Sequence, residues 1–155
     1  MIFILIILII VIIDQTTKAW AVKKLNSDDW RPALKNKVNL TLSKNKGAAL
    51  NLFENHPKFV YRTTIIAIFL LAYYLFKIIK NKGLFLTKLS LSFIIGGGIG
   101  NIIDRSKKGY VVDFFAFNIK NSPIFNIADI FIILGTIILQ LTLIFKNNPI
   151  GWKVK

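Results

Sequence analysis

Four aspartates in apolar sequence are the residues of this chain best suited to chemistry. The chain has seven acidic residues, and Asp14, Asp104, Asp113 and Asp129 lie in or beside long apolar stretches. An ionised carboxylate at membrane depth costs at least about 2.5 kcal/mol on insertion scales. The other three acidic residues lie in polar, lysine-rich sequence, so only these four need a special explanation.

Asp113 and Asp129 are the pair with the clearest catalytic potential. Asp113 stands between two valines and two phenylalanines, and Asp129 follows Asn126 by three positions, on one face of an expected helix. Two carboxylates brought together share a proton, because like charges at close range cannot both ionise easily. One carboxylate can then deprotonate a water while the other protonates a peptide carbonyl. A structural or ion-coupling acid pair, as in a transporter, fits these residues equally well.

Asp14 and Lys18 form a second polar grouping. They are four residues apart, so they share a helix face in the favourable acid-first order. Either they neutralise each other near the membrane surface, with Lys18 extended outward, or they line a polar cavity. The motif itself does not decide between the two.

Asn101, Asp104 and Arg105 form a third grouping. Their spacing places all three on one helix face, so we expect an amide, a carboxylate and a guanidinium to converge beneath a loop. A purely structural interaction between Asp104 and Arg105 is the alternative.

The segment 45–49 is the fourth grouping, with Asn45, Gly47 and two alanines. An Asn followed by Gly and small residues suits a turn where the backbone of a ligand comes close. An ordinary turn has the same composition, so this motif is weak without the others.

Four apolar stretches are expected to position these side chains. About 20 apolar residues are needed to cross a bilayer core of about 30 Å. We therefore predict an all-α membrane protein, a single domain over 1–155, with a small partly β region formed by the 1–2 and 3–4 loops. The strand signals are an alternation at 38–42 and an extended 111–114. The expected spans are 2–22, 59–79, 84–103 and 124–145, and the expected loops are 23–58 and 104–123.

The first apolar stretch also fits a cleaved secretory signal peptide. No Lys or Arg precedes it, however, and Asp14 and Lys18 interrupt its second half. We therefore expect a retained span.

Composition narrows the classes of function. The net charge is +14, but the basic residues fall mostly between apolar blocks, which favours anionic lipid headgroups over nucleic acid as their partners. The chain has no cysteine, which excludes disulfides and thiol nucleophiles, and a single histidine, His56. A zinc site or a Ser-His-Asp arrangement is therefore not expected, and we predict neither a metal nor a cofactor.

The distribution of basic residues also bears on orientation. The two loops and their flanks carry 14 of the 21 Lys and Arg residues. By the positive-inside rule, this bias alone would place the loops in the cytoplasm.

Taken together, the motifs resemble those of the lipoprotein signal peptidase family, the type II signal peptidases of bacteria. The resemblance covers nearly the whole chain, and it is the set and order of five motifs that makes it specific. They are Asp14-Gln15-x-Thr17-Lys18, Asn45-x-Gly47-Ala48-Ala49, Gly97-x-x-Gly100-Asn101-x-x-Asp104-Arg105, Val111-Val112-Asp113-Phe114 and Phe125-Asn126-x-Ala128-Asp129.

The resemblance implies an intramembrane aspartyl endopeptidase. Such an enzyme removes the signal peptide from a diacylglyceryl-modified prolipoprotein by cleaving before the lipidated cysteine. The implied catalytic pair is Asp113 and Asp129. The implied substrate-binding or pocket positions are Asp14, Lys18, Asn45, Gly47, Asn101, Arg105 and Asn126.

The resemblance also implies a topology and an inhibitor. It places both termini in the cytoplasm, both loops outside the bacterial inner membrane, and the cyclic peptide globomycin across the acid pair. We adopt this topology although the lysine count opposes it. One departure is Leu50, where the family usually has an aromatic residue. The alternative function is a small ion- or proton-coupled transporter using Asp14, Asp104 and Asp129.

Overall fold

Four long helices and a small sheet make up the computed structural model, which describes residues 1–27, 29–48, 52–119 and 122–146. The helices are α1 (Ile2–Lys24), α2 (Pro57–Ile78), α3 (Phe85–Lys108) and α4 (Ile127–Lys146). Each contains a stretch long and apolar enough to cross a membrane. The predicted fold class is therefore confirmed. Leu50 lies outside the described residues.

Two helix ends differ from the prediction by three residues or more. The third helix does not stop at residue 103 but continues to Lys108, where Gly109, with φ of 78°, caps it by donating its N–H to the Arg105 carbonyl at 3.1 Å. The predicted span ends at residue 103 because charged residues follow it, but charged residues are compatible with a helix that continues beyond the apolar stretch. The fourth helix begins at Ile127 instead of residue 124, because Ile124 and Phe125 pair with β3 as a short strand.

The two loops meet in one antiparallel sheet. Its strands are β1 (Arg31–Ala33), β2 (Val38–Asn45), β3 (Val111–Phe117) and β4 (Ile124–Phe125), in the order β1-β2-β3-β4. The strands predicted at 38–42 and 111–114 are confirmed, and both run about three residues further. Ser43 of β2 lies opposite Asp113 of β3, so the sheet brings the two loops together beside that carboxylate.

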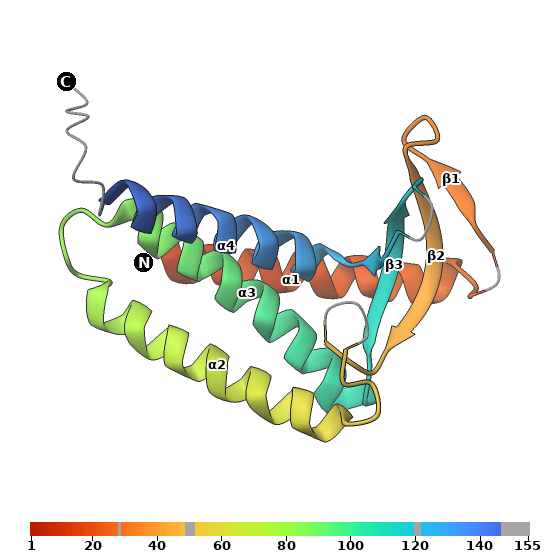
Figure 1. Ribbon diagram of the computed structural model, residues 1–155, viewed down its shortest axis with the longest axis horizontal. Helices are drawn as coiled ribbons and strands as arrows, with labels where there is room; N and C mark the ends of the chain where they lie inside the picture. Colours follow the sequence, from red (N-terminus) through yellow and green to blue (C-terminus); the bar gives the residue numbers. More distant parts are fainter. Residues whose placement is uncertain (28, 49–51, 120–121, 147–155) are drawn as a thin grey trace.

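The sheet and the membrane-crossing helices divide the molecule into two parts. Figure 1 shows the sheet at one end of the bundle, with the start of α1, the end of α4 and the α2–α3 turn at the other. Helix α3 is central: 61% of its apolar window is buried inside the protein, against 11% for α2 and for α4. The helices α1, α2 and α4 therefore pack around α3.

Glycines in α3 allow the other helices to approach closely. A Cβ at Gly97 would lie 2.5 Å from the carbonyl oxygen of Ala128 at the start of α4. A Cβ at Gly98 would overlap Ile68 of α2, and a Cβ at Gly100 would overlap the Asp14 carboxylate of α1. Neighbouring positions on α3 thus fix its distance to three different helices.

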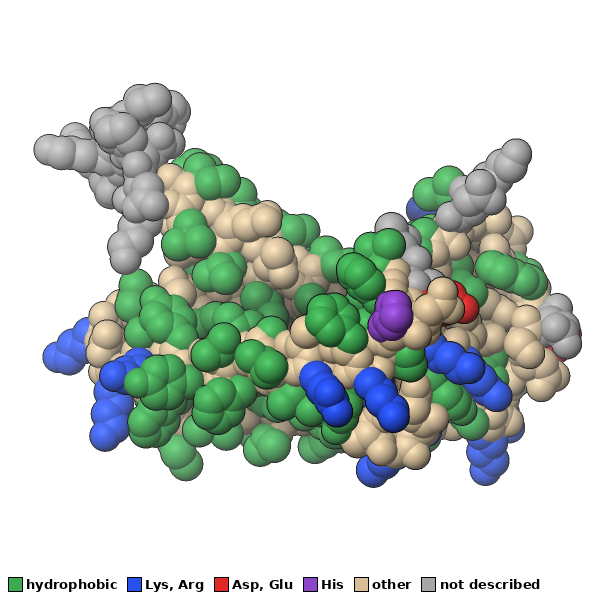
Figure 2. Space-filling model, turned by 60° about the horizontal axis from the view of Figure 1, so that its bottom comes forward, with side chains coloured by type: hydrophobic (Ala, Val, Ile, Leu, Met, Phe, Trp, Pro, Cys, Tyr) green, Lys and Arg blue, Asp and Glu red, His purple; other side chains and the backbone are tan. Residues whose placement is uncertain are grey.

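The surface agrees with a helical bundle surrounded by lipid. Figure 2 shows apolar side chains covering the length of the bundle, while Lys and Arg side chains gather toward its two ends. Large apolar side chains such as Ile66, Phe69 and Phe76 of α2 are exposed. In water such a surface would aggregate, whereas in a bilayer it is the expected solvent contact.

We predict that Gly100→Ala destabilises the protein by about 1–3 kcal/mol, because the new methyl would collide with the buried Asp14 carboxylate. Thermal unfolding in detergent measures the effect. The matched control is Gly96→Ala on the same helix, where the Cβ would lie 3.0 Å from Ile10 Cβ, a less severe contact, so we expect a smaller loss. Equal losses in the two variants would contradict this account of the α1–α3 contact.

Candidate active site

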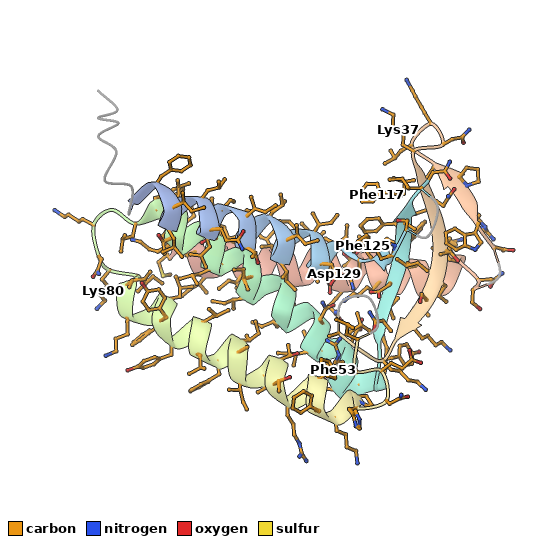
Figure 3. The ribbon with its side chains drawn as sticks, in the orientation of Figure 1. Lys37, Phe53, Lys80, Phe117, Phe125 and Asp129 are labelled. Atoms are coloured by element: carbon orange, nitrogen blue, oxygen red, sulfur yellow. The ribbon has the colours of Figure 1, made fainter. Side chains whose placement is uncertain are left out.

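The buried carboxylate of Asp113 and the partly buried carboxylate of Asp129 come from different elements and are joined by a chain of side-chain amides. Asn126 Nδ2 donates to Asp113 Oδ1 at 2.6 Å and to Asn101 Oδ1 at 3.3 Å. Asn101 Nδ2 donates to Asp129 Oδ1 at 3.0 Å. Figure 3 shows Asp129 at the start of α4 beside the sheet, at the opposite end of the bundle from Lys80. The predicted pair therefore meets where the membrane-crossing part joins the sheet.

The start of α4 positions Asp129. Asn126 Oδ1 accepts the Asp129 N–H at 3.0 Å, and Asp129 Oδ2 accepts the Asn126 N–H at 3.2 Å. This reciprocal arrangement is a capping box, which satisfies two of the N–H groups left free at a helix N-terminus. Asp129 thus lies in the first turn of α4. The Asn-x-x-Asp spacing carried this signal, but we interpreted it only as a shared helix face.

The end of β2 supplies a second amide to Asp113. Asn45 Nδ2 donates to Asp113 Oδ2 at 3.1 Å, and Asn45 Oδ1 accepts the Gly47 N–H at 2.9 Å. Arg105 donates to the Gly47 carbonyl at 2.6 Å from α3. Arg105 of α3 therefore holds the turn at 45–48. The side-chain amide of Asn45 in this turn faces the Asp113 carboxylate.

A buried ion cluster lies behind the acid pair. Lys18 Nζ is 2.9 Å from Asp14 Oδ2 and 3.2 Å from Asp104 Oδ2, and all three side chains are at most 1% exposed. Lys18 also donates to Asn101 Oδ1 at 2.8 Å. The cluster therefore connects directly to the amide chain between Asp113 and Asp129.

Each acid of the cluster also holds a backbone N–H next to one of the paired aspartates. Asp104 Oδ2 accepts the N–H of Val112 at 3.1 Å, and Asp14 Oδ1 accepts the N–H of Ala128 at 3.0 Å. Val112 directly precedes Asp113, and Ala128 directly precedes Asp129. One lysine thus fixes both segments that carry the pair.

Several sequence expectations need correction at this point. Lys18 does not extend outward, and Asp14 and Lys18 lie behind the cavity described below, not in its wall. Asp104 pairs with Lys18 and with Lys108 of its own helix, the latter at 2.9 Å. It does not pair with Arg105 among the described contacts. Asn101, Asp104 and Arg105 therefore do not converge on one place. The Asn101 amide faces the acid pair, the Asp104 carboxylate faces Lys18 of α1, and the Arg105 guanidinium faces the 45–48 turn.

A cavity of about 640 Å³ opens in front of the pair. It lies between α2, α3, α4 and the sheet. Apolar side chains of α2 and α4 form part of its wall, among them Val60, Ile132 and Ile133. Its polar lining includes Asn45, Asn101, Arg105, Asp113 and Asp129. Such a cavity suits an apolar chain with one polar bond to be held at its inner end.

Burial sets the proton affinity of Asp113, which lies in the sheet, outside the helices. Burial and, second, the negative charge of Asp129 raise the pKa of the Asp113 carboxyl to about 7. The amides of Asn45 and Asn126 and the charge of Lys18 act in the opposite direction. Asp113 can therefore gain or lose a proton near neutral pH, as acid–base catalysis requires.

One buried hydrogen-bond donor of Arg105 has no acceptor among the described residues. Its Nε is buried without a hydrogen-bond partner in the part of the chain that the structure describes, although the side chain lines the cavity. Buried donors without an acceptor are rare in folded proteins. A bound chain with a carbonyl near Arg105 would satisfy it.

Comparison with known proteins gives consistent matches over nearly the whole chain. The family model described as signal peptidase (SPase) II matches residues 6–145. The lipoprotein signal peptidase of Clostridium tetani is 42% identical over 148 residues, covering 94% of each chain. That of Caldanaerobacter subterraneus subsp. tengcongensis is 39% identical over 145 residues, covering 94% of this chain and 97% of its own.

Solved structures match the fold as well. One described as a bacterial membrane enzyme has a TM-score of 0.86 and 32% identity, covering 97% of this chain and 92% of its own. A second with the same description has a TM-score of 0.81 and 33% identity, covering 94% of each.

We predict that Lys18→Met destabilises the protein by about 3–5 kcal/mol, because it leaves the Asp14 carboxylate buried without its cation. Chemical or thermal unfolding in detergent measures the loss. The matched control is Lys108→Met: it removes the other lysine of Asp104, but its side chain is 33% exposed, so the cost is about 1 kcal/mol or less. A Lys18 variant no less stable than the control would refute the bracing role.

Proposed function

The chain belongs to the signal peptidase II family, and we propose that it is an intramembrane aspartyl endopeptidase acting on prolipoproteins. It removes the signal peptide of a diacylglyceryl-modified precursor by cleaving before the lipidated cysteine. The observation that carries the proposal is the pair Asp113 and Asp129, joined through Asn126 and Asn101 at the inner end of a cavity between apolar helices.

The acid pair can hydrolyse a peptide bond while holding one proton. The ionised carboxylate takes a proton from a water, and the water oxygen attacks the peptide carbonyl carbon. The protonated carboxyl gives its proton to the carbonyl oxygen. When the C–N bond breaks, the leaving nitrogen takes the proton collected from the water. One hydroxyl of the tetrahedral intermediate returns its proton to the other carboxylate as the carbonyl re-forms, and the pair returns to its starting state. The pKa of about 7 at Asp113 supports such a cycle near neutral pH.

The position of the pair along the helices suits a membrane-anchored substrate. Helix α3 has 24 residues, which at 1.5 Å per residue is roughly 36 Å, longer than a bilayer core of about 30 Å. Asn101 lies in its last third, so the pair lies close to the membrane surface. Water reaches that level from the sheet side, and acyl chains reach it from the lipid side.

The helices leave a lateral approach to the pair. Helices α2 and α4 both pack mainly on α3, not on each other, and the cavity lies between them. Figure 1 shows α3 running between the two. We assign this opening to the apolar signal helix of the substrate, which diffuses in the plane of the membrane. The orientation we propose is the one that the family resemblance implies: the sheet faces outward from the cytoplasmic membrane, and the termini face the cytoplasm.

The remaining site residues take roles consistent with their contacts. Asn45, Gly47 and Arg105 hold the substrate backbone at the 45–48 turn, and Asn101 and Asn126 orient the pair. Asp14 and Lys18 support the site from behind. A globomycin-like cyclic peptide filling the cavity across Asp113 and Asp129 would block the reaction.

The transporter alternative is weaker on this geometry. An ion-coupling acid must exchange its counterion during transport. Asp14 and Asp104 instead share Lys18 at 2.9 and 3.2 Å, and each also accepts a backbone N–H. Their contacts are those of structural supports.

We predict that Asp113→Asn and Asp129→Asn each lower kcat by about 10²–10⁴-fold, because neither amide can carry the shuttled proton. The assay follows cleavage of a peptide containing a diacylglyceryl cysteine, with unfolding temperature measured in parallel. Glu54→Gln removes a carboxylate outside the cavity lining and is the matched control. Substantial cleavage by either Asn variant would exclude the proposed pair.

The pH dependence gives an independent prediction. The rate should decline above about pH 7 as the pair loses its proton. Because the Asn45 amide lowers the pKa of Asp113, Asn45→Ala should raise that pKa and move the alkaline limb of kcat/KM to higher pH. Asn39→Ala, on the same strand but bonded to Asn118, is the control and leaves the limb in place. A shift to lower pH in the Asn45 variant would contradict the assignment.

A further inference from the structure

The sheet extends past the helical bundle beside α4. Figure 1 shows β2 and β3 running across the end of the bundle, with the turn between β1 and β2 lying beyond α4. We call this part of the sheet, residues 34–37 and 117–119, the sheet tip. Because the helices cross the membrane, strands that run across the helices lie roughly parallel to the membrane plane. The sheet tip therefore overhangs the lipid next to α4.

An aromatic side chain of the sheet tip points toward the membrane. The Phe117 ring lies 6.3 Å from the Phe125 ring, and Phe125 lines the cavity that contains the acid pair. Figure 3 shows both rings on the side of the sheet toward the helices. Phe117 is nevertheless 50% exposed. The bundle therefore covers this ring only in part, and in a membrane the remainder would contact lipid.

The direction of the strand sets the depth of this ring. Phe117 follows Asp113 by four residues in β3, which is about 13 Å along a strand at about 3.3 Å per residue. Asp113 is joined through Asn126 and Asn101 to Asp129, near the membrane surface. A strand parallel to the membrane keeps Phe117 at that level. Side chains of interfacial proteins bind at this boundary between headgroups and acyl chains.

The rest of the sheet tip combines apolar and basic side chains. Leu34 is 74% exposed and Ile119 is 72% exposed. Lys35 and Lys37 are exposed in the same turn, and the sheet tip contains no acidic residue. Figure 3 shows Lys37 at its end. Exposed apolar side chains beside lysines suit the surface of an anionic bilayer better than they suit water.

The turn holds these side chains in a strained conformation. Leu34, Lys35 and Asn36 have φ of 47°, 56° and 64°, left-handed values that only glycine adopts without cost. Asn118 stabilises the turn, because its N–H donates to the Lys37 carbonyl at 3.0 Å and its side-chain amide donates to the Asn36 carbonyl at 2.9 Å. Since Leu34 is largely exposed, packing within the protein does not explain an apolar side chain at this strained position. A contact outside the protein would explain it.

We propose that the sheet tip is a binding surface for the lipid bilayer around the helices, with a preference for anionic phospholipids. Its apolar side chains, Leu34, Phe117 and Ile119, enter the bilayer surface beside α4. The ammonium groups of Lys35 and Lys37 contact the phosphates of the headgroups. The sheet is then held to the membrane at the end that lies outside the bundle.

Two observations favour lipid over a protein as the occupant. The helix beside the sheet tip, α4, exposes Ile130, Leu134 and Ile137, so lipid already lies there, and a soluble protein would have to displace it to reach Phe117. The lysines give the second observation, because anionic headgroups provide the complementary charge. Basic residues in the two loops oppose the positive-inside rule, and headgroup binding gives those of the sheet tip a partner.

The first test measures the depth of the sheet tip in a bilayer. The chain has no cysteine, so Ile119→Cys in the full chain carries a single spin label, in nanodiscs of phosphatidylglycerol and phosphatidylcholine. Collision with a water-soluble nickel complex, compared with collision with oxygen, which partitions into lipid, reports the depth of the label. The control is Ser27→Cys, exposed in the segment between α1 and β1, which Figure 1 shows beyond the sheet, farther from the bundle.

We expect the label at position 119 to collide with the nickel complex at least about 3-fold less often than the label at position 27, because lipid excludes the complex. Equal collision rates would overturn the proposal. The unfolding temperature in detergent verifies that each labelled variant is folded. Leu34→Cys serves as the second position if the labelled Ile119 variant does not fold.

The charge of the lipid tests the role of the lysines. We expect the protection at position 119 to fall by about 2-fold or more when phosphatidylcholine replaces all phosphatidylglycerol, and likewise when Lys35→Gln and Lys37→Gln are combined. The matched control combines Lys80→Gln and Lys82→Gln in the α2–α3 turn, at the opposite end of the bundle, and should keep the protection. Equal protection in all of these samples would refute the preference for anionic lipid.

Other occupants would give different results. Spin–spin coupling between labels at position 119 would assign the surface to a second copy of the chain. Protection that appears only after a diacylglyceryl-cysteine peptide is added would assign the surface to the substrate. Either result would overturn the lipid contact. None of these readouts uses peptide cleavage, so their failure would leave the proposed function standing.

Discussion

The site depends on a single buried cation. Lys18 of α1 pairs with Asp14 of its own helix and with Asp104 of α3, and these acids in turn accept the backbone N–H groups of Ala128 and Val112. Burying three charges is costly, and such clusters seldom add net stability compared with apolar packing. This cluster instead fixes positions in the fold. It holds Val112 and Ala128, the residues before Asp113 and Asp129, from two helices, α1 and α3, that are in close contact with each other.

The structure therefore contains two kinds of acid at the site. Asp14 and Asp104 each have an ammonium group within 3.2 Å, so each carboxylate is paired with a cation. Asp113 and Asp129 instead receive neutral amides from Asn126 and Asn101. A neutral donor orients a carboxylate without committing it to one protonation state. The proton of the pair can then move during a reaction while the supporting charges stay unchanged.

The sequence allowed part of this to be predicted, and the limits have physical causes. Length and hydropathy were sufficient for the four spans, and a four-residue spacing was sufficient for the Asp14–Lys18 pair. The link from Lys18 to Asp104 was not accessible, because it depends on how closely α1 approaches Gly100 of α3. Strands of two or three residues, such as β1 and β4, carry too little periodicity to be recognised. The capping box at Asn126 was present in the sequence and was missed.

The packing of α2 has a mechanical consequence. This helix contributes Val60 and Thr64 to the cavity wall, yet none of the groups that support the acid pair lie on it. Those groups belong to α1, α3, α4 and the sheet. A displacement of α2 would therefore change the width of the opening without changing the geometry of the carboxylates. If the proposed function holds, admission of a bulky chain and accuracy at the reacting bond depend on separate parts of one small fold.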